Sequence, residues 1–119
     1  MIDEILELDL LDIILKLCNT SFHNKIRSNA VLALSLLTYH IKMFDELINK
    51  GVIDIVMTLC QDSDKEVKQY ATLTLVHFAL NKQSINILIK KGVMDLFKSF
   101  ASIKDAEIQT NVSWIFLAL

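Results

Sequence analysis

Three histidines and two cysteines are the side chains of this 119-residue chain best suited to catalysis or metal binding. His23, His40 and His77 fall in three separate segments, and no two of them are spaced as zinc ligands are. Cys18 and Cys60 stand far apart, so there is no Cys-x-x-Cys pair, and no nucleophile stands beside His77. With only two glycines there is also no phosphate-binding loop. We therefore expect no enzyme, no metal site and no cofactor.

The two cysteines belong to a larger pattern, because they occupy matching places in LKLCN and MTLCQ. INKGVID at 48–54 likewise recurs as IKKGVMD at 89–95, 41 residues later. The same spacing relates Gly51 to Gly92, Asp54 to Asp95, Val67 to Ile108, Ala71 to Val112 and Leu75 to Phe116. A period of this length is typical of helical solenoids. We predict a single domain, 1–119, made of three units at about 2–39, 40–80 and 81–119, in which both thiols are buried as small apolar groups.

Composition and local signals favour an all-α protein. Hydrophobic residues make up 53% of the chain and charged residues 22%, with no proline and two glycines, too few turn residues for a sandwich or barrel. In the second unit we predict helices at about 41–50, 53–60 and 65–79, the first of which ends at Gly51. Asp62, Ser63 or Asp64 would cap the third helix. We expect three such helices in every unit.

Each third helix carries an apolar stripe that should face the core. In the second unit the stripe is Val67, Ala71, Leu75 and Phe78, spaced four, four and three residues apart. The equivalent stripes are Ile26, Ala30, Leu34 and Leu37 in the first unit and Ile108, Val112, Phe116 and Leu119 in the third. Asp12, Asp54 and Asp95 share one place, in the first turn of the second helix, where a negative charge complements the helix dipole.

The third unit, GVMDLFKSF followed by DAEIQTNVSWIFLAL, resembles the armadillo repeat family. It is similar to the family pattern of a glycine, an apolar pair, a second helix, an acidic stretch and an Ala-rich helix with a Trp. The resemblance covers nearly the whole chain and implies a right-handed α-solenoid of about three armadillo-type three-helix repeats. Two departures exist: Asp9 replaces the glycine in the first unit, and Asp replaces the family's frequent Pro at the start of the second helix.

Armadillo proteins resemble one another in exposing their third helices along a concave groove. With Trp114 as reference, residues three before and four after it share a helix face. The face comprises Asn29, Leu32 and Leu36, then Tyr70, Leu73 and His77, then Asn111, Trp114 and Ala118. Importin-α-like members pair a Trp here with an Asn four residues on, and no such Asn is present. The Lys/Arg row of β-catenin-like grooves is missing as well, so this surface is mostly apolar.

The resemblance and the apolar face together predict a non-enzymatic protein–protein interaction module, a scaffold or adaptor. Its partner would be a protein or peptide that offers an apolar or amphipathic segment to the groove. The alternative is a structural subunit of a larger assembly, or a homo-oligomer, that packs through its C-terminal helix. SWIFLAL ends without a polar cap, so we expect a slice of a longer solenoid or one covered by a partner.

Charge and hydropathy restrict the other classes of partner. The net charge of −2 offers no basic stripe for a nucleic acid. No apolar run approaches the 18 residues of a membrane span. The first residues, MIDEILELD, are acidic where a secretory signal is basic, so we expect an intracellular protein, cytoplasmic or nuclear.

Overall fold

The structure, a computed structural model, describes residues 4–19, 22–40 and 44–118. These ranges hold eight α-helices and no strand, so the all-α prediction is confirmed. The helices are α1 (Glu4–Leu17), α2 (Asn24–His40), α3 (Phe44–Asn49), α4 (Val52–Leu59), α5 (Lys65–Ala79), α6 (Lys82–Lys90), α7 (Val93–Phe100) and α8 (Ala106–Ala118).

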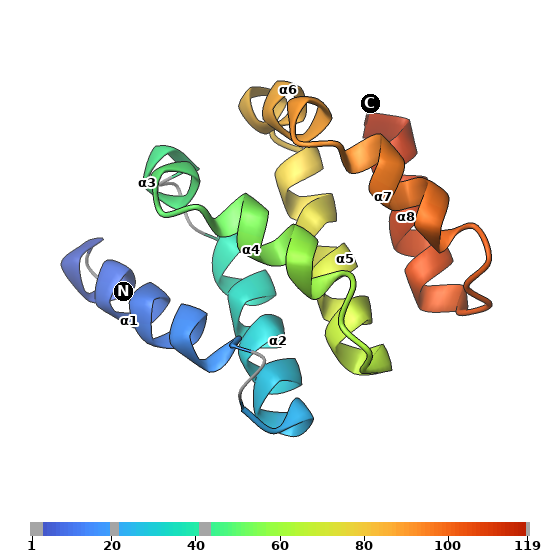
Figure 1. Cartoon of the computed structure of the whole chain (residues 1–119). Helices are drawn as coiled ribbons and strands as arrows, with labels where there is room; N and C mark the ends of the chain where they lie inside the picture. The colour runs from blue at the N-terminus through green and yellow to red at the C-terminus, as the bar shows by residue number, and fades with distance from the viewer. Residues whose placement is uncertain (1–3, 20–21, 41–43, 119) are drawn as a thin grey trace.

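The helices are arranged like a repeat (Figure 1). The long helices α2, α5 and α8 lie side by side, and α5 packs against both of the others. Each is also covered by the shorter helix that precedes it, α1 on α2, α4 on α5 and α7 on α8. The short helices α3 and α6 lie along one edge, and the two chain ends lie at opposite sides of the row. This arrangement places the same face of three successive helices next to one another.

Gly51 and Gly92 end the short helices α3 and α6 in the same way. Their φ angles are 72° and 87° with ψ of 26° and 29°, the left-handed conformation that glycine adopts without strain. No other residue in the described ranges has a positive φ. A Cβ at either position would meet no atom within 4 Å, so any cost of a side chain there comes from the backbone conformation. The predicted role of Gly51 is confirmed, and the two segments fold alike.

The first unit differs from the other two, and our expectation of three helices in every unit was wrong for it. Helix α1 runs through Asp9 without a break, so the described residues of this unit form two helices, α1 and α2. A residue other than glycine disfavours the left-handed turn, and the helix continues instead. In the second unit α3 begins at Phe44, and residues 41–43 of the predicted 41–50 helix lie outside the described residues.

The core follows the predicted stripes with two exceptions. Val67, Ala71, Leu75 and Phe78 of α5 are all fully buried. In the first unit Ile26 is exposed instead, and the next residue, Arg27, points inward to an ion pair. In the third unit Phe116 is 50% exposed because no helix in the described ranges packs over that side of α8, and Leu119 lies outside them.

Successive units are also tied by equivalent ion pairs. Lys50 Nζ lies 2.7 Å from Asp12 Oδ1, and Lys91 Nζ lies 2.8 Å from Asp54 Oδ2. Each lysine ends the short helix of one unit and reaches back to the aspartate of the unit before it. Asp54 and Asp95 lie in the first turns of α4 and α7 as predicted, whereas Asp12 lies within α1 because that helix starts early.

Across the ranges that the structure covers, no helix combines the length and the apolar character needed to cross a bilayer. The longest, α2, has 17 residues.

Candidate functional site

The nine residues predicted to line a groove lie on the three adjacent long helices. Asn29, Leu32 and Leu36 belong to α2, Tyr70, Leu73 and His77 to α5, and Asn111, Trp114 and Ala118 to α8. We call these nine residues the long-helix surface. None of them is in the buried class, and Leu36 and Trp114 are 57% and 54% exposed. Large apolar side chains are therefore open to solvent on α2 and α8, the two outer helices of the row.

A hollow of about 360 Å³ separates α5 from α8 on this side of the molecule. Three residues of the long-helix surface line it, Tyr70, Leu73 and Asn111. The remaining lining comes from Gln69, Ala106, Glu107 and Thr110, which lie near the N-terminal ends of the two helices or one turn further on. The only formal charge in the lining is the carboxylate of Glu107, so the hollow suits an apolar group or a group that bears one positive charge.

A second hollow, of about 210 Å³, lies between α2 and the end of α5. Its lining combines His77 of the long-helix surface with Thr38, Tyr39, Leu80 and Asn81. The rings of Tyr39 and His77 are 5.1 Å apart, and Thr38 Oγ1 lies 3.4 Å from His77 Nδ1. The sequence analysis missed these four residues. Extending the same helix face one turn beyond Leu36 reaches Tyr39, so the helical spacing could have identified that residue.

Asn111 has a structural contact that the sequence analysis did not anticipate. Its Nδ2 donates hydrogen bonds to the carbonyl oxygen of Gln69, at 3.2 Å, and to Thr72 Oγ1, at 3.0 Å. Both acceptors belong to α5, so the amide of Asn111 holds α8 against α5. The amide nitrogen of this member of the long-helix surface is therefore already hydrogen-bonded within the fold.

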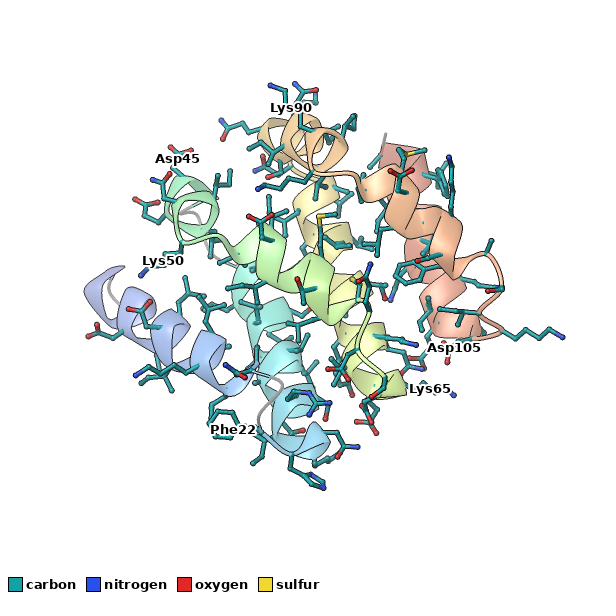
Figure 2. All side chains as sticks on the ribbon, in the orientation of Figure 1. Phe22, Asp45, Lys50, Lys65, Lys90 and Asp105 are labelled. Carbon is teal, nitrogen blue, oxygen red and sulfur yellow. The ribbon has the colours of Figure 1, made fainter. Side chains whose placement is uncertain are left out.

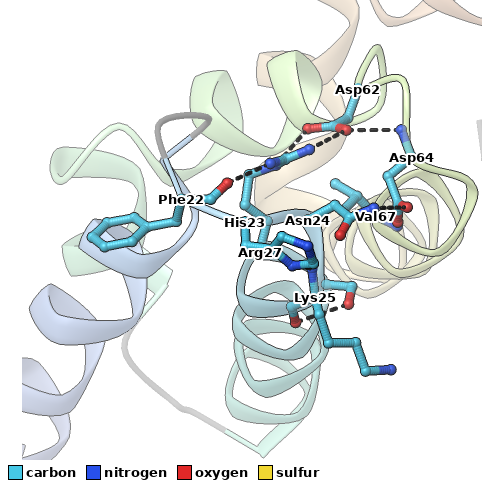
Figure 3. Close-up of polar contacts among 9 residues, drawn as sticks. Phe22, His23, Asn24, Lys25, Arg27, Asp62, Asp64 and Val67 are labelled. Carbon is cyan, nitrogen blue, oxygen red and sulfur yellow. Dashed lines mark hydrogen bonds and ion pairs between the residues drawn. The ribbon is translucent and has the colours of Figure 1, made fainter.

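A buried ion pair fixes α2 against the loop between α4 and α5 (Figure 3). Arg27 Nε and Nη2 donate to Asp62 Oδ2 and Oδ1 at 3.0 and 2.9 Å, and Arg27 Nη1 donates to the carbonyl oxygen of Phe22. Asp62 also accepts from the backbone N–H of Asp64 at 2.9 Å. Because both groups are planar and nearly inaccessible, this bidentate contact joins the N-terminal part of α2 to the segment that precedes α5.

The pKa of Asp62 reflects two opposing influences. Burial raises it, but the hydrogen bond from Arg27, the backbone N–H of Asp64 and the nearby positive charges lower it further than burial raises it. The net pKa is therefore below the ordinary value, and the ion pair is present throughout the neutral range.

The N-terminal ends of α5 and α8 are capped by equivalent aspartates. Val67 N donates to Asp64 Oδ2 at 3.1 Å, and Ile108 N donates to Asp105 Oδ1 at 3.0 Å. The sequence allowed Asp62, Ser63 or Asp64 as the cap of α5, and the structure identifies Asp64. The backbone hydrogen bond from Ile108, followed by contacts with Gln69 and Lys65, lowers the pKa of Asp105. Figure 2 shows Lys65 and Asp105 meeting at this edge, 3.2 Å apart.

The two cysteines first considered for chemistry belong to the apolar core of the described ranges. Cys18 and Cys60 are free and buried, as predicted. Burial raises the pKa of Cys18 to about 11 and raises that of Cys60 as well, so neither thiol is a good nucleophile at neutral pH. No group of three metal-ligating side chains occurs among the described residues.

Comparison with known proteins identifies the fold but no family. No protein-family model matches the chain, and no curated protein sequence matches it. A solved structure that matches is the crystal structure of an engineered protein from the Northeast Structural Genomics Consortium, with 18% sequence identity and a TM-score of 0.80. The match covers 91% of this chain and 44% of the engineered protein. This chain therefore spans less than half of the length of the engineered protein. At this identity the likeness concerns the fold alone.

Proposed function

We propose that this chain is an armadillo-like, right-handed α-solenoid that acts as a non-enzymatic interaction module or scaffold. Support for the fold comes from the equivalent left-handed glycines and from the row of long helices, each covered by a shorter one. The lysine–aspartate ion pairs between successive units also support this fold. The proposed setting is intracellular, cytoplasmic or nuclear, with a protein rather than a nucleic acid as partner.

The long-helix surface is the proposed binding site. The observation that carries this proposal is the exposure of Leu36 and Trp114 at opposite ends of a surface that contains two hollows. Contiguous exposed apolar groups on a soluble protein usually mark an interaction site. Tyr39 and Leu80 extend the apolar area beside the hollow near His77.

The lining indicates the chemistry of the partner segment. An amphipathic helix or an aliphatic stretch would bury its apolar side chains against Leu36, Leu73 and Trp114. A lysine or arginine at one end of that segment would suit Glu107. Interface energy concentrates in aromatic anchors, so Tyr70 and Trp114 should contribute most.

Selection from a displayed library of amphipathic helical peptides, with the full 119-residue chain as target, tests the proposal. The dissociation constant of a selected peptide is then measured for the unmodified chain and for a variant that combines Tyr70→Ala with Trp114→Ala. We expect the double substitution to weaken binding by more than about 2 kcal/mol, or roughly 30-fold.

A matched control removes exposed apolar side chains elsewhere. Ile13 on α1 and Ile89 on α6 are both exposed and lie off the long helices, so Ile13→Ala with Ile89→Ala should leave binding unchanged. Circular dichroism establishes that both double variants remain helical. Unchanged affinity in the folded Tyr70 and Trp114 variant would exclude the long-helix surface as the binding site.

A further inference from the structure

The face of the third unit beyond α7 and α8 contains a second apolar area, separate from the long-helix surface. A hollow of about 520 Å³ opens between these helices. The apolar side chains in its lining are Met94, Phe97, Phe100, Ala101, Val112 and Phe116. We call these residues the end face. Met94 is 42% exposed and Phe116 is 50% exposed, although Phe116 packs against the Phe97 ring at 5.2 Å.

The same positions in the preceding unit are covered. Ile53 matches Met94 at the spacing of 41 and is 1% exposed, and Leu75 matches Phe116 and is fully buried. The third unit lies on that side of the second, where α8 packs against α5. The chain therefore contains its own example of what covers such a face, namely another helical unit of the same design.

A polar contact indicates one further property of a unit that would cover the end face. Asp12 and Asp54 each pair with a lysine of the unit that follows, Lys50 and Lys91 respectively. Asp95 is the third member of this series. Its side chain is 88% exposed and has only a long contact of 3.8 Å to Lys98 of its own helix. A unit on the end face would reach Asp95 with a lysine at the end of its short helix.

A second copy of this chain fits the end face less well than such a unit does. At the spacing of 42 the residue that matches Lys50 in the first unit is Leu8, so a head-to-tail copy would bring no lysine to Asp95. Helix α1 also continues through Asp9 and lacks the glycine turn that orients α4 and α7.

We propose that the end face docks a helical unit of a partner built like residues 82–118 of this chain. The unit would consist of a short helix that ends in Lys-Gly, an apolar helix and a long helix. Its apolar helices would bury Met94 and Phe116, and its lysine would pair with Asp95. This surface is distinct from the long-helix surface, and the proposal does not depend on the groove.

An in-register extension tests the proposal directly. A second copy of residues 79–119 is appended after Leu119, which continues the period of 41. The copied Lys91 then follows Asp95 by as many residues as Lys91 follows Asp54. If the end face docks this unit, the extended chain unfolds in one transition, with a midpoint raised by about 5 °C or more.

Met94→Asp in the original third unit is the matched substitution, made in both lengths of chain. Met94 is partly exposed in the 119-residue chain. Met94→Asp should therefore lower the unfolding midpoint of that chain by less than half of the increase that the extension produces. In the extended chain Met94→Asp should abolish that gain. Asp95→Lys should reduce the gain by a smaller amount, and Lys91→Asp in the appended copy should restore it.

Three results would overturn the proposal. The first is an extended chain that melts in two transitions, one of them at the original midpoint. The second is a Met94→Asp cost that is equal in the two lengths. The third is light scattering that shows the 119-residue chain as a dimer which Met94→Asp dissociates, since the occupant would then be a second copy.

A two-component measurement covers the case in which the extended chain fails to fold. A peptide of residues 79–119 that carries Trp114→Phe is added to the full chain, and the fluorescence of Trp114 on the full chain is followed. Saturable binding that Met94→Asp weakens at least tenfold supports the proposal. Absence of binding by a peptide that circular dichroism shows to be helical, at concentrations up to about 1 mM, contradicts it.

Discussion

The contact between α2 and α5 and the contact between α5 and α8 have the same place in the repeat but different polar chemistry. At the first, the guanidinium of Arg27 is buried against the carboxylate of Asp62. At the second, the equivalent positions are Lys68 and Ile103, which cannot form such a pair, and the amide of Asn111 bridges the helices instead. We infer from this comparison that apolar packing sets the arrangement of the long helices. The polar contacts between them differ in what they contribute to stability.

One polar feature is common to both contacts. Asn24 Nδ2 donates to Asp64 Oδ1 at 3.0 Å, and the equivalent Lys65 lies 3.2 Å from Asp105 Oδ2. In each case the first residue of one long helix contacts the capping aspartate of the next. The cap therefore both starts a helix and joins it to its neighbour, which makes the buried ion pair the main difference between the two contacts.

The largest difference should appear when the positive charges are removed. Arg27→Ala leaves the carboxylate of Asp62 buried without its partner and should destabilise the fold by about 3 kcal/mol. Lys68→Ala, at the equivalent position of α5, should change stability by less than about 0.5 kcal/mol. Urea unfolding of both variants measures the difference. Equal losses would show that the ion pair does not distinguish the two contacts.

Acid should weaken the same contact progressively. Because the pKa of Asp62 is lower in the folded state, this group stabilises fully above its unfolded pKa of about 3.9. That contribution is lost as the pH falls through the lower folded pKa. Unfolding free energies measured between pH 7 and pH 3 should therefore decline on the acidic side, with a shallower decline in Asp62→Asn. An identical pH dependence in the two proteins would contradict this assignment.

The two glycine turns should respond equally, since they have nearly the same conformation. Gly51→Ala and Gly92→Ala each place a Cβ in the left-handed region and should cost about 1–2 kcal/mol. Neither substitution creates a clash, because no atom lies within 4 Å of the added Cβ. Thermal unfolding of the two variants checks the equivalence. A cost at one position at least twice that at the other would indicate that the units are not interchangeable.

The smallest effect is expected at the amide bridge of the second contact. Asn111→Ala removes two hydrogen bonds to α5 at a half-buried site and should cost about 1 kcal/mol. Asn29, on α2, is the exposed counterpart in the first unit, and Asn29→Ala should be close to neutral. Urea unfolding separates the two. A neutral Asn111→Ala would mean that apolar packing alone holds α8.

Much of the second unit could be predicted from its sequence, because local signals decide it. The helix expected at 65–79 is Lys65–Ala79, Asp64 caps it, and Gly51 lies at the turn that ends α3. These features depend on residues within one or two turns of one another. The stripe of α5 was also correct, since a helix between two neighbours buries its apolar face.

The misses arose where distant segments meet or where the repeat stops. The pairing of Arg27 with Asp62 joins residues 35 apart, outside the period of 41, so the repeat gives no signal for it. Ile26 was expected in the core because it matches Val67 at the spacing of 41, but the pairing of Arg27 turns this part of α2 so that Ile26 is exposed. The hollow formed by Tyr39 and Leu80 depends on how the ends of α2 and α5 come together, which periodicity within one helix does not specify.

Chemical-shift mapping of the chain, free and bound to a selected amphipathic peptide, tests the central claim that the long helices form a binding surface. We expect the largest backbone amide shifts on α2, α5 and α8, centred on Tyr70 and Trp114, with small shifts on α1, α3 and α6. Shifts concentrated on α3 and α6, or on the end face around Met94, would contradict the claim.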